Sequence, residues 1–234
     1  MRAMILAAGR GERMRPLTDH CPKPLLSAAD KPLIVYHLER LAAAGFTDIV
    51  INHAHLGEQL VAALGDGSRW GVSITWSPEP IGALETAGGI RQALTHLDDG
   101  IDSPFLVING DIYCDWTIRP QALTDHDLAH LVLVDNPPQH PAGDFVLSGG
   151  RVANKTPDHA ASTHTFAGIG FYRPSLFKDL TTDQPAKLAP LLRSAMAQGR
   201  VSGEHHSGRW EDVGTPERLA LLDAELRAHS SRTG

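Results

Sequence analysis

The first thirty residues constrain the fold of this chain more than any other stretch. Residues 3–8 form a short apolar run, which predicts a buried β-strand. A loop of small residues follows and includes Gly9, and glycine lets backbone N–H groups approach a bound anion closely. Arg13 and Lys23 come next, and neither belongs to an apolar pattern. A strand, a glycine-rich loop and fixed cations together predict a site that holds a polyphosphate.

This loop differs from two common phosphate-binding motifs. The dinucleotide fingerprint G-x-G-x-x-G matches at Gly9 and Gly11, but Met14 occupies the position of its third glycine. The P-loop string G-x-x-x-x-G-K-(S/T) is absent. Residues 6–18 and 22–25 instead resemble the signature of sugar-phosphate nucleotidyltransferases, L-A-x-G-x-G-x-R-(L/M)-x-P-L-T followed by P-K-(P/A)-(L/M). The resemblance implies that a nucleoside triphosphate and a sugar-1-phosphate are the substrates.

Strands and helices alternate along the chain, which predicts an α/β fold. In the first half, buried strands are expected at residues 48–52 and 105–108 and an alternating strand at residues 72–76. Helices are expected at residues 32–44, 56–64 and 86–97. This order predicts a mainly parallel sheet with helices on both faces, which binds ligands at the carboxyl ends of its strands. A smaller α+β lobe is expected to follow, with elements at residues 129–135, 143–152, 165–172, 174–180, 187–198, 201–205 and 216–228.

The resemblance implies a Rossmann-like three-layer nucleotidyltransferase fold with a mixed, mainly parallel sheet. We expect a single domain over residues 1–234, with a nucleotide-binding half at about residues 1–125 and a sugar-binding half at about residues 126–234. The chain ends soon after the Trp210 motif, so the C-terminal β-helix of many relatives is not expected.

Composition excludes several other classes of protein. The formal net charge is −6, which argues against a nucleic-acid-binding protein. No apolar run approaches a transmembrane span, so no membrane partner is expected. Two cysteines without a disulfide framework, and no export signal, predict a cytoplasmic protein. A monomer or a small homo-oligomer is expected.

Cysteine and histidine offer two alternative sites. Cys114 is interpreted as a buried or inert thiol, because no histidine-based constellation around it predicts a nucleophile. His205 and His206 suggest metal binding, but no histidine in the sequence is spaced as a ligand set. They are therefore interpreted as solvated side chains or as part of a substrate-binding lobe.

Two carboxylates are candidates for a metal site. Asp111 follows a buried strand in N-G-D, where it is either a turn residue or a ligand for a hard cation. Asp212 precedes Thr215, which is suited to cap the last helix, so a structural role is the alternative there. The resemblance implies that Asp111 and Asp212 hold Mg²⁺ and that Asn109 lies beside the nucleotide. It also implies that Arg13, Lys23 and Asp111 are catalytic.

The base is expected at residues 77–89, which resemble the family segment E-x-P-L-G-T-A-G. Glu85 occupies a position at which many relatives have glycine. This difference weakens any inference of this chain's base specificity from that of its relatives. A plain glycine-rich loop before a helix is the alternative interpretation. The nucleotide-binding residues implied are Leu6, Ala7, Ala8, Gly9, Gly11, Glu12, Arg13, Lys23, Glu79, Glu85, Thr86, Gly88 and Asn109.

The sugar-1-phosphate is expected to contact the second half of the chain. Gly143 and Asp144 occupy the place of the family's Y-G-V hairpin, and Lys155 that of the lysine in its E-K-P motif. Asn154 replaces the acidic residue of E-K-P, and Lys187 offers a further cation. A surface hairpin without a ligand is the alternative for this region.

Several further segments resemble one branch of the family, the N-acetylmuramate α-1-phosphate uridylyltransferases. The segments are residues 51–54, 64–69, 128–137, 187–193 and 201–205. This favours UTP and N-acetylmuramate α-1-phosphate as substrates, in cell-wall recycling. A mannose- or heptose-1-phosphate guanylyltransferase is the alternative enzyme, and a nucleotide-sugar-binding regulatory protein is the alternative without catalysis.

Overall fold

The computed structural model describes residues 1–80, 84–120, 123–156 and 163–233. The chain divides into two compact units, each assembled from separate stretches of sequence. Unit 1 comprises Met1–Met4, Leu84–Ile108 and Arg119–Gly208, and unit 2 comprises Ile5–Ala83, Asn109–Ile118 and Arg209–Gly234. Within each unit, residues that are far apart in the sequence are therefore brought together.

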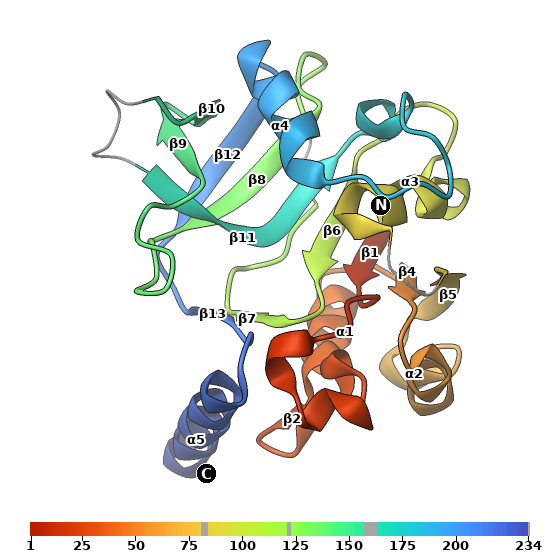
Figure 1. Ribbon diagram of the computed structural model, residues 1–234, viewed down its shortest axis with the longest axis vertical. Coiled ribbons are helices and arrows are strands. Elements are labelled where there is room, and N and C mark those ends of the chain that lie inside the picture. The colour runs from red at the N-terminus through yellow and green to blue at the C-terminus, as the bar shows by residue number, and fades with distance from the viewer. Residues whose placement is uncertain (81–83, 121–122, 157–162, 234) are drawn as a thin grey trace. The chain divides into compact units, whose positions relative to one another are not determined.

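Unit 1 is built on a mixed sheet whose strands hydrogen-bond in the order β6-β11-β8-β12-β10-β9 (Figure 1). These strands are β6 Phe105–Asn109, β8 Ala129–Val134, β9 Phe145–Ser148, β10 Arg151–Asn154, β11 Thr163–Tyr172 and β12 Val201–His206. β8 and β12 are parallel, whereas β11 is antiparallel to both β6 and β8. All six residues of β8 are buried, as its continuous apolar sequence predicts.

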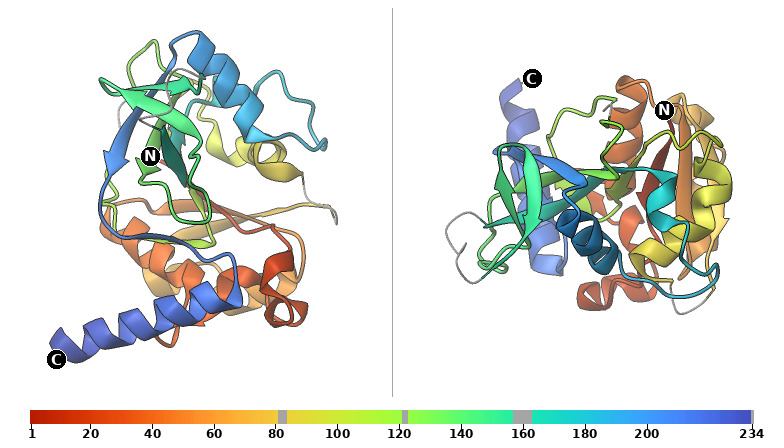
Figure 2. Two further views of the ribbon diagram at one scale, coloured as in Figure 1. Left: turned by 60° about the vertical axis from the view of Figure 1, so that its left-hand side comes forward. Right: turned by 90° about the horizontal axis from the view of Figure 1, so that it is seen from above.

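Two helices belong to unit 1, among the residues that the structure describes: α3 Glu85–Leu97 and α4 Leu188–Ala197. α4 lies against β10 and β12 (Figure 2). The helix expected at residues 174–180 is only a 3₁₀ turn, η6 Pro174–Phe177. The Asp102 carboxylate accepts hydrogen bonds from the Ser175 N–H at 2.7 Å and the Ser175 hydroxyl at 2.8 Å, which fixes the start of this turn.

Unit 2 contains the parallel pair β4 Asp48–His53 and β5 Ser73–Pro78, with α2 Gly57–Leu64 between them in the chain. Strand β1 Ala3–Leu6 contributes its last two residues to this unit. The remaining elements are η1 Glu12–Met14, η2 Leu17–Asp19, η3 Lys23–Leu25, β2 Ser27–Ala28, β3 Lys31–Pro32, α1 Leu33–Ala43, η4 Ser68–Trp70, β7 Ile112–Cys114, β13 Trp210–Asp212 and α5 Pro216–Thr233.

The mixed α/β fold expected from the sequence is confirmed. The longer strands and helices begin within about two residues of their expected positions, and α5 continues past residue 228 to Thr233. The pairs β2–β3 and β7–β13 were not expected, because strands of two or three residues are too short to show alternation. The division into a nucleotide-binding and a sugar-binding half stays a prediction. Among the described residues, no helix has the length and apolar character needed to cross a bilayer.

Unit 2 buries a histidine within its core. His37 lies on α1 and its exposed fraction is 1%. Burial lowers the pKa of His37 to about 4, and the nearby Arg40 guanidinium adds to this effect. The imidazole of His37 is therefore neutral at physiological pH.

Acid should destabilise the fold through His37. Between the usual histidine pKa of 6.5 and about pH 4, the unfolded chain binds a proton that the folded chain does not, so the free energy of unfolding falls as pH falls. The loss from this residue is about 3 kcal/mol across that window. Urea unfolding should show that the free energy of unfolding falls less between pH 7 and pH 4.5 in His37→Leu than in the wild type. The exposed control His96→Leu should lose as much unfolding free energy as the wild type. An equal fall in all three proteins would contradict the prediction.

Candidate active site

Two hydrogen bonds donated by backbone N–H groups fix the start of the loop that follows β1. The Gly110 N–H donates to the Leu6 carbonyl at 2.9 Å, and the Ala7 N–H donates to Asn52 Oδ1 at 2.8 Å. A Cβ at Gly110 would lie only 2.7 Å from the Leu6 oxygen, so no other residue fits without a shift. Asn52 is buried and donates through Nδ2 to Glu79 Oε1 at 2.6 Å. Glu79, a predicted nucleotide-binding residue, thus joins the network that holds the loop.

The two glycines of the loop differ in their surroundings. A Cβ at Gly9 would meet no atom within 4 Å, so the backbone faces open space there. Gly11 has φ +70°, a conformation that favours glycine, and its Cβ would lie 3.0 Å from Thr18 Cγ2 and 3.3 Å from Lys23 Cβ. The loop is therefore closed around Gly11 and open at Gly9. Open space at Gly9 leaves room for a ligand to approach the backbone.

Arg13 is the more exposed of the two predicted catalytic cations. Its side chain is 65% exposed, and Nη2 lies 3.8 Å from Asp212 Oδ2. The neighbouring Glu12 forms ion pairs with Arg10 at 2.6 Å and Arg15 at 3.6 Å. These exposed pairs contribute little to stability, but they leave Arg13 as the cation of the loop that faces Asp212.

Lys23 is the second cation, and it is buried. Its side chain is 9% exposed, and Nζ lies 2.7 Å from Asp111 Oδ2. Asp111 follows Asn109 and Gly110 at the end of β6, and its side chain is 37% exposed. The structure thus brings together two residues that are distant in sequence and that were both predicted to be catalytic. A buried ammonium group needs such a partner, because burial without one strongly disfavours the charged form.

A short ribbon brings the two candidate metal ligands side by side. β7 and β13 are antiparallel, with Asp212 opposite Ile112. The Val213 N–H donates to the Asp111 carbonyl at 3.0 Å, so the chain at Asp111 adjoins the chain at Asp212. Both carboxylates are partly exposed and offer hard oxygen atoms. The donor set at this place therefore fits Mg²⁺.

Arg218 is a functional candidate that the sequence analysis missed. Its Nη1 atom donates to Asp212 Oδ2 at 2.9 Å and to the Asp212 carbonyl at 3.1 Å. Arg218 lies in the first turn of α5, where the helix dipole disfavours a cation. The sequence could have indicated Arg218, because it is a basic residue at an unfavourable helix position shortly after a candidate metal ligand. Asp212 is thus flanked by two arginines, Arg13 and Arg218.

One hydrophobic cluster supports the backbone at both Arg13 and Asp212. Met14 and Val213 are fully buried in it, and they directly follow Arg13 and Asp212 in the chain. The cluster comprises Met14, Ala28, Leu33, Val213, Leu219 and Leu222. Packing of these side chains fixes the backbone from which Arg13 and Asp212 extend.

The part of the expected base segment from Leu84 onward belongs to unit 1 and lies at the start of α3. Residues 81–83 of this segment lie outside the described part of the chain. Glu85 is exposed and has φ +58°, a left-handed conformation that glycine adopts more easily. Thr86 follows and is partly buried. A Cβ at Gly88 would lie 2.6 Å from the Gln184 carbonyl oxygen, and the Gly88 N–H donates to Ala186 at 3.1 Å. In this structure, the missing side chain of Gly88 lets the backbone near Gln184 pack against α3.

Three of the predicted sugar-binding residues lie together in unit 1. Lys155 Nζ donates to the Gly143 carbonyl at 2.5 Å and to the Ala142 carbonyl at 3.2 Å. The Asp144 carboxylate accepts from the Phe166 N–H at 2.9 Å. Lys155, Gly143 and Asp144 therefore belong to one hydrogen-bonded group.

The other two predicted sugar-binding residues are associated with α4. Asn154 Nδ2 donates to the Arg193 carbonyl at 3.1 Å. Lys187 is exposed and directly precedes the first residue of α4. The predicted sugar-binding residues thus form two local groups within unit 1.

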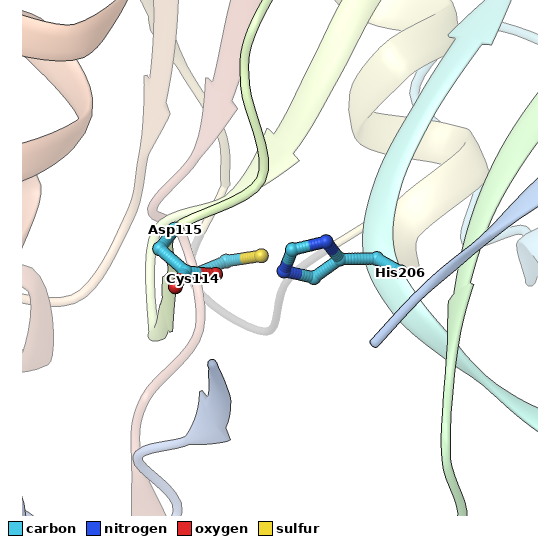
Figure 3. Close-up of side chains that lie close together, drawn as sticks. All are labelled: Cys114, Asp115 and His206. Carbon is cyan, nitrogen blue, oxygen red and sulfur yellow. The ribbon is translucent and has the colours of Figure 1, made fainter. Parts of the chain in front are cut away.

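The Cys114 thiol is buried, which agrees with its interpretation as a buried thiol. Cys114 ends β7 and is 2% exposed, and Asp115 follows it (Figure 3). Burial raises the pKa of the Cys114 thiol to about 11, although an N–H group from Trp116 partly offsets this. The thiol is therefore protonated at neutral pH and a poor nucleophile.

Glu85→Gly should stabilise the protein, because it removes the cost of a left-handed conformation at a residue with a side chain. We expect the free energy of unfolding to rise by about 1 kcal/mol. The matched control is Glu58→Gly, at an exposed helical position in α2, where glycine should cost about 1 kcal/mol. Denaturant unfolding measures both. A loss of stability in Glu85→Gly equal to that of Glu58→Gly would contradict the prediction.

Comparison with known proteins places this geometry in a family. The model of the nucleotidyl transferase family matches residues 2–229. The N-acetylmuramate α-1-phosphate uridylyltransferase of Neisseria meningitidis serogroup B is 56% identical over 230 residues, which cover 96% of this chain and 97% of that enzyme. The mannose-1-phosphate guanyltransferase of Candida albicans is 34% identical, over 93% of this chain and 62% of that enzyme.

Among solved structures, one from Bacillus anthracis matches with a TM-score of 0.81 and 25% sequence identity. It is described as a glucose-1-phosphate thymidylyltransferase in complex with a sucrose, and the match covers 97% of this chain and 95% of that one. The fold is therefore the one expected from the loop after β1. The chain belongs to the nucleotidyl transferase family.

Proposed function

We propose that this protein transfers a uridylyl group from UTP to N-acetylmuramate α-1-phosphate, which yields a nucleotide-sugar and pyrophosphate. The observation that carries the reaction class is the set of two cations and two carboxylates beside the open loop of unit 2. The choice of base and sugar rests on the 56% identity to the meningococcal enzyme across nearly its whole length.

The reaction needs positioning and charge neutralisation more than proton transfer. An oxygen of the sugar phosphate attacks the α-phosphorus of UTP, and the bond from that phosphorus to the bridging oxygen of pyrophosphate breaks. The attacking phosphate is already ionised, so no general base is required. Arg13 neutralises charge on the triphosphate, and Lys23 bridges the α-phosphate and the incoming phosphate.

Mg²⁺ is the proposed metal, held by the oxygens of Asp111 and Asp212. When bound, it supplies positive charge to phosphate oxygens. In the structure described here, Lys23 neutralises Asp111, while Arg13 and Arg218 neutralise Asp212. If the carboxylates held Mg²⁺, the side chains of Lys23 and Arg13 would be available to bind phosphate.

The remaining predicted residues are assigned to the two substrates. The loop from Leu6 to Glu12, together with Glu79, Glu85, Thr86, Gly88 and Asn109, would bind the nucleotide. Gly143, Asp144 and Asn154 would contact the sugar. Lys155 or Lys187 would meet the sugar phosphate or the lactyl carboxylate of N-acetylmuramate, since either group requires a cation.

An alternative enzyme is a mannose- or heptose-1-phosphate guanylyltransferase, supported by the similarity to the fungal guanyltransferase. A regulatory protein without catalysis is less well supported, because Arg13, Lys23 and Asp111 are all present. Peptidoglycan recycling in the cytoplasm, by a monomer or small homo-oligomer, is the setting that we propose.

Pyrophosphate release should identify the substrates. We expect rapid release with UTP and N-acetylmuramate α-1-phosphate, and kcat/KM lower by at least about tenfold with GTP or with N-acetylglucosamine-1-phosphate. Mannose-1-phosphate with GTP tests the alternative enzyme directly. Equal kcat/KM for the two N-acetyl sugars would overturn the proposed sugar specificity and leave the reaction class intact. No release with any pair of substrates would overturn the enzyme itself.

Variants of the charged groups test the mechanism. Asp111→Asn should lower kcat by at least about a hundredfold, the order seen when a preorganised charge is lost. Arg13→Lys should also lose activity, because a lysine cannot bind two phosphate oxygens with a planar fork. Lys23→Ala should lower kcat more than UTP affinity measured by calorimetry. The control Lys31→Ala removes an ion pair with Glu39 at 2.6 Å and should leave kcat unchanged. Full activity in all of the first three variants would exclude this site.

A further inference from the structure

Three neighbouring strands of unit 1 bring together a set of metal-binding side chains. Asp135 directly follows β8, His164 is near the start of β11, and His205 is near the end of β12. Each residue offers one ligand atom, and these atoms lie within 4.8 Å of one another. No spacing in the sequence indicates this set, because its three members are far apart along the chain.

The side chains of the set already lie close together. His205 Nε2 is 2.8 Å from Asp135 Oδ1, and the ring centroids of His164 and His205 are 4.7 Å apart. Nδ1 of His164 is buried and has no hydrogen-bond partner among the described residues. A buried ring nitrogen without a partner carries a free-energy cost, which a bound ligand would remove.

Strand pairing holds the backbone of this set in place. Thr165 pairs with Val134 across β11 and β8, which sets His164 opposite Asp135. His205 pairs with Leu133 across β12 and β8. Asn136 accepts a hydrogen bond from the Thr165 hydroxyl at 2.9 Å, which further fixes the chain beside Asp135. The ligand atoms therefore need only side-chain adjustment to converge.

The chemistry of the donors selects the metal. Two imidazoles and one carboxylate suit zinc and other late divalent transition metals, whereas Mg²⁺ prefers oxygen ligands alone. Zinc bound at about 2.0 Å by tetrahedral ligands places those ligands about 3.3 Å apart, which small rotations of these side chains can reach. Three protein ligands leave a fourth position for water or for a group from another molecule.

We propose that Asp135, His164 and His205 form a binding site for a divalent transition metal of the zinc class. The site is chemically different from the oxygen-only pair Asp111 and Asp212 of unit 2. A metal bound here links β8, β11 and β12, so it stabilises unit 1 independently of nucleotide transfer. The Asp135 side chain is 78% exposed, so the metal can enter from solvent.

The test uses Co²⁺ as a spectroscopic probe on chelator-treated protein. Excess Mg²⁺ is present throughout, because it occupies oxygen-only sites and competes poorly for imidazole. One equivalent of Co²⁺ should give the intense visible absorption of a low-coordinate complex, and Zn²⁺ should remove that absorption. Zn²⁺ should also raise the Tm of the wild-type protein, because it binds the folded chain.

Variants separate the proposed site from chance binding. His164→Ala and His205→Ala should weaken Co²⁺ affinity by at least about a hundredfold, the upper end of the loss seen for removing an outer-shell partner. Asp135→Asn alters only a highly exposed side chain, so it tests the site even if a histidine variant fails to fold. The control His96→Ala lies on α3 and is exposed, and it should bind Co²⁺ as the wild type does.

Two results would overturn the proposal. One is wild-type Co²⁺ affinity in the folded variants of Asp135, His164 and His205. The other is a wild-type spectrum no different from hydrated Co²⁺. Because Co²⁺ absorption is read without substrate, neither result depends on whether the protein is a uridylyltransferase.

Discussion

The ion pair between Lys23 and Asp111 is the interaction on which the candidate active site depends. A buried ammonium group is stable only beside a negative charge, and Asp111 supplies that charge at 2.7 Å. The geometry of the pair rests on the chain around it. Gly110 packs against the Leu6 carbonyl, and Gly11 packs against the Lys23 side chain. Replacement of either charged residue therefore leaves the other unneutralised, so a loss of activity there combines a catalytic and a structural cause.

The second carboxylate is neutralised in a related way. Asp212 lies between Arg13 and Arg218, and all three extend from backbone that the cluster of Met14 and Val213 fixes. Positive and negative groups are thus positioned before any phosphate is bound. Such preorganisation is effective in catalysis because the protein does not need to reorganise its dipoles as charge moves during the reaction. In the proposed reaction the carboxylates would bind the metal ion and the cations would bind phosphate, so each charged group would keep a partner of opposite charge.

Much of the fold and part of the site could be predicted from the sequence. The apolar runs of β1, β4 and β8 indicate buried strands, and the loop at Gly9 and Gly11 indicates the family. The features that the sequence analysis missed depend on how distant segments of the chain pair and pack. The β7–β13 ribbon is too short to leave a periodic signal, yet it brings Asp111 and Asp212 together. Arg218 and the set formed by Asp135, His164 and His205 are likewise visible only once the strands and helices are paired. The left-handed backbone at Glu85 could have been inferred, because many relatives have glycine there.

Unit 2 is assembled from three separate stretches of the chain, and this has a consequence for synthesis on the ribosome. Lys23 is in the first stretch, Asp111 in the second and Asp212 in the third. The hydrophobic cluster likewise joins Met14 and Leu33 to Leu219 and Leu222 of α5. A nascent chain that lacks the third stretch therefore lacks the side chains of Leu219 and Leu222, which complete the cluster, and it lacks Asp212. Because domains fold as units during translation, unit 2 reaches its complete form only after α5 has emerged from the ribosome.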